Sequence, residues 1–452
     1  MASMHPPAAE RKVGPGGAVS PHSLTWKELK KIMNRSTKAV YDEVSKCNRC
    51  GFCQAHCPIF ELTGDERNVA RGHNVHVRKL MEGSLTITQD FKDPLFECLL
   101  CKSCVANCFP AVRTDKNVIA GRAEYLKRMG QPKLFRFLFH RLLPDPIRLA
   151  KYVRLAAFGK NSGMAKLARV MGILKWFGRD LDKAEGIVDR LPQTFFRERI
   201  SPLSLPNSPG KKQLVYFVGC GFNFVLPHVS EATLRVLGST GIQIQVADNC
   251  CCGLPAYGYG DLEAARKMAR KNIETLERLE GETVMTDCGS CSAFLKEYPE
   301  LFEDDPGMKS RAERLAKRVK GFSEYLQDWA PERDSAKPLP GKVTYHDPCH
   351  MSRYQGIVKE PRSLLKKIPG INYVELPEAD RCCGAAGSYN ILHYEQSMKV
   401  LDRKMENIRK TGADVVTTEC PGCIIQLRHG AYRTKIPVRV LHLSELISEV
   451  SP

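Results

Sequence analysis

Nineteen cysteines dominate the chemistry that this sequence could perform, and eighteen of them fall into four spaced groups. Two groups contain four cysteines each, three of them at strict three-residue intervals: Cys47, Cys50, Cys53 and Cys57, then Cys98, Cys101, Cys104 and Cys108. Two later groups contain five each: Cys220, Cys251, Cys252, Cys288 and Cys291, then Cys349, Cys382, Cys383, Cys420 and Cys423. Thiolates are soft metal ligands. This usage predicts a protein that holds metal–sulfur clusters and moves electrons.

The four-cysteine groups are typical of cubane [4Fe–4S] clusters. A C-x2-C-x2-C run surrounds three irons, and in two-cluster modules the fourth thiolate comes from the other group. Zinc sites instead use two separated C-x2-C pairs, which argues against zinc here. One departure is Phe109, which separates Cys108 from Pro110, whereas Pro58 follows Cys57 directly. We therefore expect a first ferredoxin set (Cys47, Cys50, Cys53, Cys108) and a second ferredoxin set (Cys98, Cys101, Cys104, Cys57).

The five-cysteine groups are copies of one another, because matching cysteines are offset by 129, 131 and 132 residues. A near-constant offset with matching secondary structure indicates an internal duplication. We call them the first repeat set (Cys220, Cys251, Cys252, Cys288, Cys291) and the second repeat set (Cys349, Cys382, Cys383, Cys420, Cys423). Adjacent cysteines can both point inward only at a tight bend, which Gly253 and Gly384 permit. Five thiols exceed the four that a tetrahedral zinc uses, so a larger iron–sulfur centre is favoured.

Cys250 is the cysteine left over. Arg381 stands at its position in the second copy. The pairing Cys251–Cys252 is preferred because Gly253 then matches Gly384, which leaves Cys250 as a small buried residue.

The elements that must position these cysteines differ between the two halves of the chain. Forty residues separate Cys57 from Cys98, which suits helices between cluster loops. We expect one helix from Ser23 or Thr25 through Lys46 and another over residues 68–81. After residue 213, short apolar runs alternate with helical patterns, which predicts parallel α/β layers with cysteines at strand ends. The expected strands are 214–218, 242–246, 283–286, 342–346, 373–376 and 414–418, and the expected helices 230–238, 261–279 and 394–410.

The predicted fold class is a multidomain α plus α/β protein: an all-helical two-cluster ferredoxin module followed by two duplicated α/β cysteine-rich domains. We expect a disordered tail at 1–23, the ferredoxin domain at 24–125 and a basic helical linker at 126–205. The two cysteine-rich domains follow at 206–335 and 336–452.

Positive charge is concentrated before the repeats. The chain carries a net charge of +18, and residues 121–180 contain fourteen lysines and arginines against three acidic residues. Two helical stretches place basic residues opposite a broad apolar face: Lys133, Arg136 and His140, then Arg148, Lys151 and Arg154. The pattern fits interfacial helices on anionic lipid, and it equally fits ordinary helices packed on a core.

Several classes of protein are disfavoured. The N-terminus has no apolar core of a signal peptide, and no apolar run approaches the roughly 18 to 20 residues of a membrane span. We expect a cytoplasmic protein, either free or peripheral at the inner face of the cell membrane. Aromatic-plus-basic recognition modules are missing, so we expect no nucleic acid partner. No dinucleotide fingerprint follows a strand, so the chain is not expected to bind NAD or FAD itself.

Three histidines lie beside cysteines. His346 and His350 flank Cys349 and could tune a centre by hydrogen bonding to sulfur, or could simply pack at a strand end. His56 is interpreted as an exposed neighbour of Cys57. No side-chain constellation for oxidising a substrate was found, so no catalytic residue is assigned.

Beyond spacing, local segments resemble one family. CNRCGFCQAHCP, ELTGDE, HDPCH, CCGAAGSYN and TGADVVTTECPGC make the chain, from about residue 35 onward, similar to the glycolate oxidase iron–sulfur subunit. The five-cysteine repeats resemble the CCG domains of heterodisulfide reductase. Iron–sulfur subunits of anaerobic glycerol-3-phosphate dehydrogenase and of lactate-utilisation complexes share the pattern.

The resemblance implies two [4Fe–4S] clusters in the ferredoxin module and, at the ten repeat cysteines, noncubane iron–sulfur clusters or zinc. It implies the electron-transfer subunit of an FAD-linked 2-hydroxy-acid dehydrogenase acting on glycolate or D-lactate. The donor would be a separate FAD-containing dehydrogenase subunit and the acceptor a molecule such as quinone. By itself the chain should not oxidise the substrate. The alternative is a thiol–disulfide reductase that uses the repeat centres.

Overall fold

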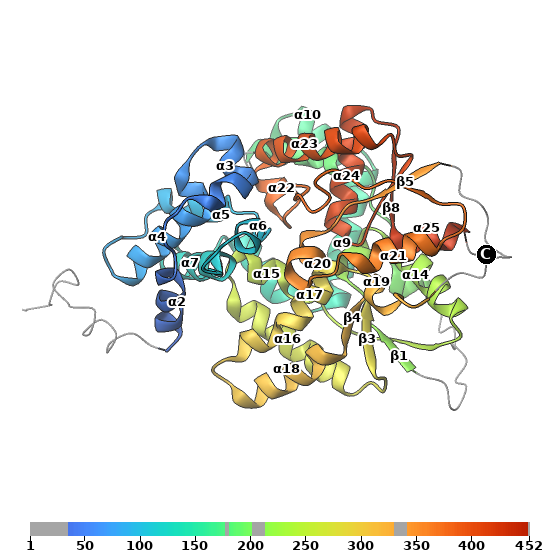
Figure 1. The fold of residues 1–452 in the computed structure, drawn as a ribbon, viewed down its shortest axis with the longest axis horizontal. Helices are drawn as coiled ribbons and strands as arrows, with labels where there is room; N and C mark the ends of the chain where they lie inside the picture. Colours follow the sequence, from blue (N-terminus) through green and yellow to red (C-terminus); the bar gives the residue numbers. More distant parts are fainter. Residues whose placement is uncertain (1–34, 177–179, 201–212, 330–340, 451–452) are drawn as a thin grey trace, which may run out of the picture.

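The computed structural model describes residues 35–176, 180–200, 213–329 and 341–450 of the chain. The tail expected at 1–23 and the start of the helix expected from Ser23 or Thr25 lie outside these ranges. Figure 1 shows a helical N-terminal part on one side (blue to cyan) and the two repeats on the other (yellow, then orange to red).

The N-terminal part is built from short helices. Within the described residues from 35 to 200, every regular element is a helix or a helical turn. Those of the ferredoxin part are α2 (Arg35–Ser45), η2 (Phe52–His56), α3 (Pro58–Thr63), η3 (Glu66–Asn68), α4 (Ala70–Met81), η4 (Gln89–Phe91), α5 (Lys92–Phe96), α6 (Ser103–Ala106) and α7 (Thr114–Met129). Val77 and Leu80 of α4 and Ile119 of α7 are buried together in the main core. Gly121 permits this contact, since a Cβ there would lie 3.0 Å from Leu95 and 3.1 Å from Val77.

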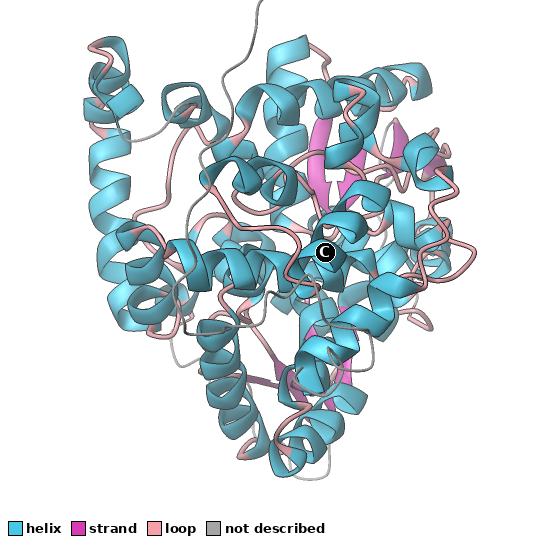
Figure 2. Ribbon diagram, turned by 90° about the vertical axis from the view of Figure 1, so that its left-hand side faces the viewer, coloured by secondary structure: helices cyan, strands magenta, loops and turns pink. Residues whose placement is uncertain are grey.

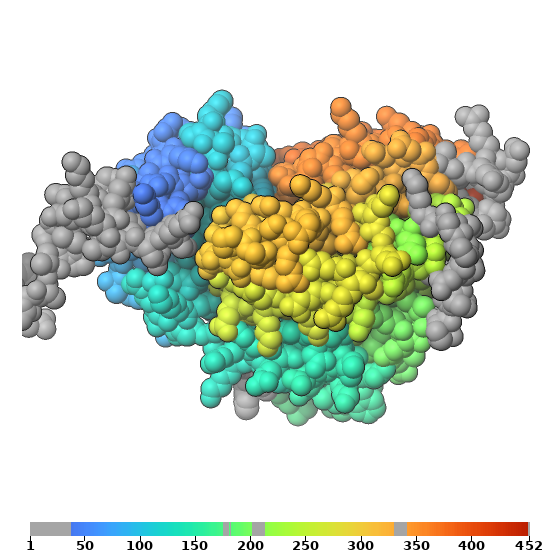
Figure 3. Space-filling model, turned by 90° about the horizontal axis from the view of Figure 1, so that it is seen from below, coloured from blue at the N-terminus to red at the C-terminus, as the bar shows by residue number. Residues whose placement is uncertain are grey.

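The linker packs against the first repeat. Its elements are α8 (Lys133–Phe137), the π-helical turn η5 (Leu138–Leu142), α9 (Pro146–Asn161), α10 (Met164–Val170), η6 (Ile173–Trp176), α11 (Leu181–Ala184), η7 (Glu185–Ile187) and α12 (Phe196–Arg199). Phe135 stacks on Tyr259 of the first repeat at 4.6 Å between ring centroids, and Leu143 and Leu149 are buried in the shared core. Figure 3 shows the linker as a continuous band along one side of the molecule (turquoise).

Each repeat is built on a four-stranded parallel sheet, and the two sheets lie apart with helices around each (Figure 2). The first sheet has the order β2-β1-β3-β4 and the second β6-β5-β7-β8. The strands are β1 (Gln213–Tyr216), β2 (Gln243–Val246), β3 (Thr283–Thr286), β4 (Val319–Gly321), β5 (Lys342–Tyr345), β6 (Asn372–Tyr373), β7 (Val415–Thr418) and β8 (Arg439–His442). The register also repeats, because Tyr216 pairs with Met285 as Tyr345 pairs with Thr417.

Helices cover both sheets. Those of the first repeat are α13 (Cys220–Phe224), α14 (Pro227–Ser239), α15 (Leu254–Tyr259), α16 (Leu262–Glu277), α17 (Gly289–Glu297), η8 (Tyr298–Phe302), α18 (Pro306–Arg318) and α19 (Phe322–Tyr325). Those of the second are α20 (Cys349–Gln355), α21 (Lys359–Lys367), α22 (Tyr389–Leu392), α23 (Tyr394–Thr411), α24 (Pro421–Thr434) and α25 (Leu443–Val450). The duplicated α/β layers expected from the sequence are therefore present.

The two repeats meet through the starts of their helices. A Cβ on Gly221, directly after Cys220, would lie 2.8 Å from Pro421, which directly follows Cys420. A Cβ on Gly289 would likewise lie 2.5 Å from Met351. These glycines let cysteine-bearing helix N-termini from both copies approach one another.

Candidate metal centres

The structure brings the eight ferredoxin-type cysteines together in two groups. Cys47, Cys50, Cys53 and Cys108 line one cavity of about 30 Å³. Cys57, Cys98, Cys101 and Cys104 line a second cavity of about 30 Å³. Cys104 lies at both. Each cavity thus receives its fourth cysteine from the other group, as the spacing predicts: Cys108 lines the first cavity and Cys57 the second.

The two cluster loops share an unusual backbone. Arg49 (φ 55°) and Gly51 (φ 81°) are left-handed in the first, and Leu100 (φ 53°) and Lys102 (φ 56°) in the second. These are the second and fourth residues after Cys47 and Cys98 respectively. A non-glycine residue in this region costs on the order of 1–3 kcal/mol and persists where its surroundings impose it. The same left-handed conformation at the same two positions shows that both loops are bent to turn their thiols inward.

Burial makes these thiols poor anions without a positive partner. It raises the pKa of Cys57 to about 12 and that of Cys98 to about 11. Amide groups partly oppose this, since Leu100 N lies 3.5 Å from Cys98 Sγ and Phe60 N lies 3.5 Å from Cys57 Sγ. Metal binding must then release protons from these thiols, as it does in folded thiolate sites. Four inward thiols around one cavity fit a cluster.

The five thiols of each repeat set form an unbroken chain of contacts. In the first set the order is Cys220, Cys251, Cys252, Cys291, Cys288, with Cys220 Sγ 3.7 Å from Cys251 Sγ. In the second set the order is Cys349, Cys382, Cys383, Cys423, Cys420, with Cys383 Sγ 3.5 Å from Cys423 Sγ. The matching residues occupy the same places in both chains. Each repeat therefore offers five convergent thiols from three loops.

Local structure explains this convergence. Gly253 (φ 96°) and Gly384 (φ 86°) adopt left-handed turns directly after the paired cysteines. A Cβ on Gly384 would also lie 2.7 Å from the Ser397 carbonyl oxygen. Cys288 caps α17 and accepts a hydrogen bond from Cys291 N at 3.4 Å. Helix N-termini favour negative charge, and so favour thiolates.

Some repeat thiols are tuned toward the anion. Hydrogen bonds from Cys251 and Cys291 lower the pKa of Cys252 to about 6. Hydrogen bonding from Cys423 likewise lowers the pKa of Cys420 to about 6, and hydrogen bonds from Cys382 and Cys423 hold that of Cys383 well below its usual value. Each set thus contains at least one thiol whose pKa is held below its usual value by neighbouring thiols.

A buried acid precedes the last cysteine pair of each set. Asp287 accepts hydrogen bonds from Tyr216 and Ser230, and Glu419 accepts one from Tyr345 at 3.0 Å. Burial raises the pKa of Asp287 to about 6 and that of Glu419 to about 7. Glu419 also accepts from Ser323 N of the first repeat at 3.0 Å, so it joins the two copies.

The four cysteine sets adjoin in a definite spatial order. Cys104 links the two ferredoxin cavities. Cys101 of the second ferredoxin set lies beside Cys382 of the second repeat set, and both belong to a small apolar cluster with Ile59, Leu99, Tyr389 and Val400. Ser290, between the last two cysteines of the first repeat set, lies 3.4 Å from Cys420 Sγ of the second. The second repeat set therefore lies between the second ferredoxin set and the first repeat set.

The first repeat set is covered by the linker. Cys251 N donates to the Leu143 carbonyl oxygen at 3.2 Å. Leu143, Pro146 and Leu149 line a cavity together with Cys220 and Cys251. The beginning of α9 therefore lies directly over the first repeat set.

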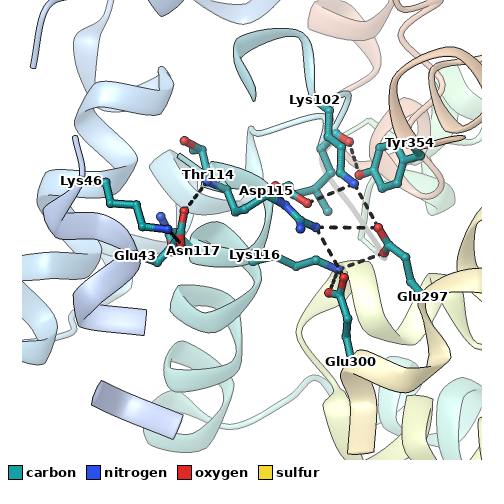
Figure 4. Close-up of polar contacts among 12 residues, drawn as sticks. Glu43, Lys46, Lys102, Thr114, Asp115, Lys116, Asn117, Glu297, Glu300 and Tyr354 are labelled. Carbon is teal, nitrogen blue, oxygen red and sulfur yellow. Dashed lines mark hydrogen bonds and ion pairs between the residues drawn. The ribbon is translucent and has the colours of Figure 1, made fainter. Parts of the chain in front are cut away.

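A buried ionic junction joins the ferredoxin part to both repeats (Figure 4). Glu297, at the end of α17, accepts hydrogen bonds from two lysines of the ferredoxin part, Lys102 Nζ at 3.0 Å and Lys116 Nζ at 2.9 Å. Lys102 Nζ also lies 3.4 Å from the ring centroid of Tyr354 on α20. Burial acts to raise the pKa of Glu297, but the two ammonium groups outweigh it and hold the pKa below its usual value. The junction fixes both repeats against the second cluster loop.

The residues left open by the sequence have distinct surroundings. Cys250 Sγ lies 3.3 Å from Asn272 Oδ1 and 3.8 Å from the Met268 carbonyl oxygen. His350 Nδ1 lies 3.0 Å from Ser290 Oγ, so its ring reaches Cys420 only through that hydroxyl. His56 is half-buried against Phe52. Lys102, Ser290 and Glu297 were not singled out by sequence reasoning, although the first two lie inside the C-x2-C motifs.

Comparisons with known proteins agree with this architecture. The family model "4Fe-4S dicluster domain" matches residues 43–111, and "Cysteine-rich domain" matches 214–296 and 343–428. "Glycolate oxidase iron-sulfur subunit, linker region" matches 131–188. A "Probable glycolate oxidase iron-sulfur subunit" of Bacillus subtilis is 32% identical over 438 residues, 94% of this chain and 98% of that protein. The chain belongs to the glycolate oxidase iron–sulfur subunit family.

Shorter relatives match as well. A "Lactate utilization protein A" from an Exiguobacterium species is 32% identical over 234 residues, 52% of this chain and 96% of that protein. One from Bacillus thuringiensis is 32% identical over 240 residues, 53% of this chain and all of that protein. The matches to the 4Fe-4S dicluster and cysteine-rich family models support iron–sulfur clusters as cofactors. Among the described residues, no helix has the length and apolarity needed to cross a membrane.

Proposed function

We propose that this chain is the iron–sulfur electron-transfer subunit of an FAD-linked 2-hydroxy-acid dehydrogenase acting on glycolate or D-lactate. An FAD-containing subunit would donate electrons, and a quinone would accept them. In this proposal the two ferredoxin sets hold [4Fe–4S] clusters, and the ten repeat cysteines hold further iron–sulfur clusters or zinc. Bound there, iron–sulfur groups supply one-electron redox chemistry. The names of the relatives support the substrate class.

The contact between Cys101 and Cys382 is the observation that carries the proposal. It joins the ferredoxin module to the repeats at the level of the thiols themselves, within a cluster of apolar side chains. The spatial order then defines the two ends of the series: the first ferredoxin set at one end, and the first repeat set beneath the linker at the other. The chain's own contribution is to hold four redox sites in series.

The outer face of the linker supports an acceptor in the membrane. Large apolar side chains are exposed on α9 and α10, among them Leu155 (67%), Phe158 (63%), Leu167 (60%) and Val170 (76%). Lys151 and Lys166 are exposed on the same helices. Such a mixture suits an anionic lipid surface. One α-helix, about 10–12 Å across, would separate that surface from the first repeat set. His140 does not share this face, because it bonds Asp261 at 2.9 Å.

The decisive experiment is anaerobic reduction of the cluster-loaded chain. With an FAD-containing 2-hydroxy-acid dehydrogenase subunit and glycolate or D-lactate, we expect the visible iron–sulfur absorption to bleach and a soluble quinone analogue to be reduced. Without that subunit neither should occur. A fully loaded chain that the flavoprotein cannot reduce would overturn the proposal, as would substrate oxidation by the chain alone.

A matched pair of cysteine variants tests the series. Cys382→Ser removes the thiol that touches Cys101, whereas Cys250→Ser removes a thiol directed toward Asn272. We expect the first to abolish quinone reduction while the ferredoxin part still bleaches, and the second to leave both intact. If the reduced chain instead cleaves disulfides and passes nothing to quinone, the thiol–disulfide reductase alternative is correct.

A further inference from the structure

One imidazole lies among the thiols of the second repeat set. A ring nitrogen of His346 and the Sγ atoms of Cys383 and Cys423 all lie within 4.8 Å of one another. His346 is only 1% exposed, at the end of β5. The three side chains come from separate segments of the repeat. A nitrogen and two sulfurs in this arrangement could supply three ligands to one metal ion.

The imidazole has no other strong partner. Within the described part of the chain, neither of its ring nitrogens forms a hydrogen bond of normal geometry. The Ala379 carbonyl acts on the ring weakly, but it already accepts Asp347 N at 3.1 Å and Lys404 Nζ at 3.2 Å. A buried polar group left without a partner costs free energy. The lone pair of one ring nitrogen is therefore available to bind a metal ion.

The first repeat lacks this group. Tyr216 and Tyr345 occupy the same place in their sheets, so Phe217 stands where His346 does. Phe217 is fully buried and apolar. The repeats therefore offer the same five thiols in the same order, but only the second offers a nitrogen at this position.

We propose that His346 is a metal ligand, together with Cys383 and Cys423, so that the second repeat holds a mixed thiolate–imidazole centre. The first repeat holds an all-thiolate centre. Tetrahedral zinc and the irons of iron–sulfur clusters both accept such a donor set. The inference rests on the proposed metal-binding role of the repeat cysteines, and it assigns the two copies different centres.

The test uses the intact, anaerobically purified chain and needs no variant to begin. Metal analysis identifies iron or zinc in the repeats. For iron, pulsed EPR compares unlabelled protein with protein carrying 15N-histidine; for zinc, X-ray absorption at the zinc edge detects imidazole scattering. We expect a histidine nitrogen coupling that changes with the isotope, or scattering from one imidazole per zinc.

Two variants then locate the nitrogen. His346→Phe reproduces the first repeat, and the nitrogen signal should be lost. His350→Phe removes the neighbouring imidazole that bonds Ser290, and the signal should remain. An all-sulfur spectrum in the unaltered protein overturns the inference while leaving electron transfer untouched. A nitrogen signal that survives His346→Phe also overturns it. Repeats without any metal would overturn both the inference and the proposed metal-binding role.

Discussion

Replacing Glu297 by glutamine should loosen the junction between the ferredoxin module and the repeats. The carboxylate is 13% exposed and faces Lys102, which is 7% exposed, and Lys116, which is 20% exposed. The substitution keeps the shape of the side chain but leaves two poorly hydrated ammonium groups without their shared anion. Asp115, 3.5 Å from Lys102, and Glu300, 2.7 Å from Lys116, compensate in part.

The expected loss follows from the burial. Removing one partner of a buried ion pair costs about 3–5 kcal/mol, and the remaining acids place this case near the lower figure. Because the urea m-value of a chain of this size exceeds the roughly 3 kcal/mol per molar of small proteins, the unfolding midpoint should fall by less than about 1 M. Glu300→Gln is the matched control. Its side chain is 44% exposed, so its loss should cost at most about 1 kcal/mol.

The assay is anaerobic urea unfolding of the cluster-loaded chain, followed by intrinsic fluorescence. A double variant, Lys102→Met with Glu297→Gln, should lose less than the sum of the single losses, because one uncompensated cation is gone. Equal midpoints for Glu297→Gln and Glu300→Gln would refute the assignment of Glu297 as the anion that joins the modules. Strict additivity in the double variant would refute the pairing with Lys102.

Three other outcomes are expected. Folding raises the pKa of Glu419 from its ordinary 4.5 to about 7. The stabilisation that this shift provides is therefore complete below pH 4.5 and is lost as the pH rises through about 7. In urea unfolding, Glu419→Gln should remove about 3 kcal/mol of that pH dependence, and an unchanged pH profile would contradict this. In vesicle flotation, Leu155→Ser with Phe158→Ser should weaken binding to anionic vesicles by about 2–4 kcal/mol, roughly 30- to 1000-fold. Tyr432→Ser changes an 84% exposed residue outside the linker and should not weaken vesicle binding. Equal losses of binding in both variants would refute the proposed lipid-binding face of the linker. Gly384→Ala should cost at least about 1–3 kcal/mol in thermal or urea unfolding, from its φ of 86° and its approach to a backbone oxygen, and a stable variant would show that the turn is not required.

Much of this molecule could be predicted from cysteine spacing. The grouping of the thiols could be predicted because each motif acts locally. The three-residue intervals and the Cys-Cys-Gly turn bend only a few residues of backbone, and this bend directs the thiols of the motif to one side. The six expected strands are present, although β6 is reduced to Asn372–Tyr373. The fourth strands, β4 and β8, were missed. Val319–Gly321 is only three residues long, and Arg439–His442 begins with a charged residue and ends with a polar one, so neither is recognised as an apolar run.

The spatial order of the sets could not be predicted. In sequence the first repeat set follows the ferredoxin module, but in the structure Cys382 of the second copy touches Cys101. That contact depends on how two sheets and the helical module pack, which no local pattern encodes. The role of His346 was left open for the same reason, since its neighbours Cys383 and Cys423 come from later segments of the fold.

The pairing of Cys101 with Cys382 has a consequence for biogenesis. The two residues are 281 positions apart, so a ribosome must complete most of the polypeptide before the later one can cover the earlier one. Until then, the first repeat already contacts the second cluster loop through Lys102 and Glu297, but the side that carries Cys101 is not yet covered by the second repeat. A cluster held by the second ferredoxin set would be enclosed on that side only by the domain made last. A chain truncated before residue 382 would leave that side of the loop uncovered.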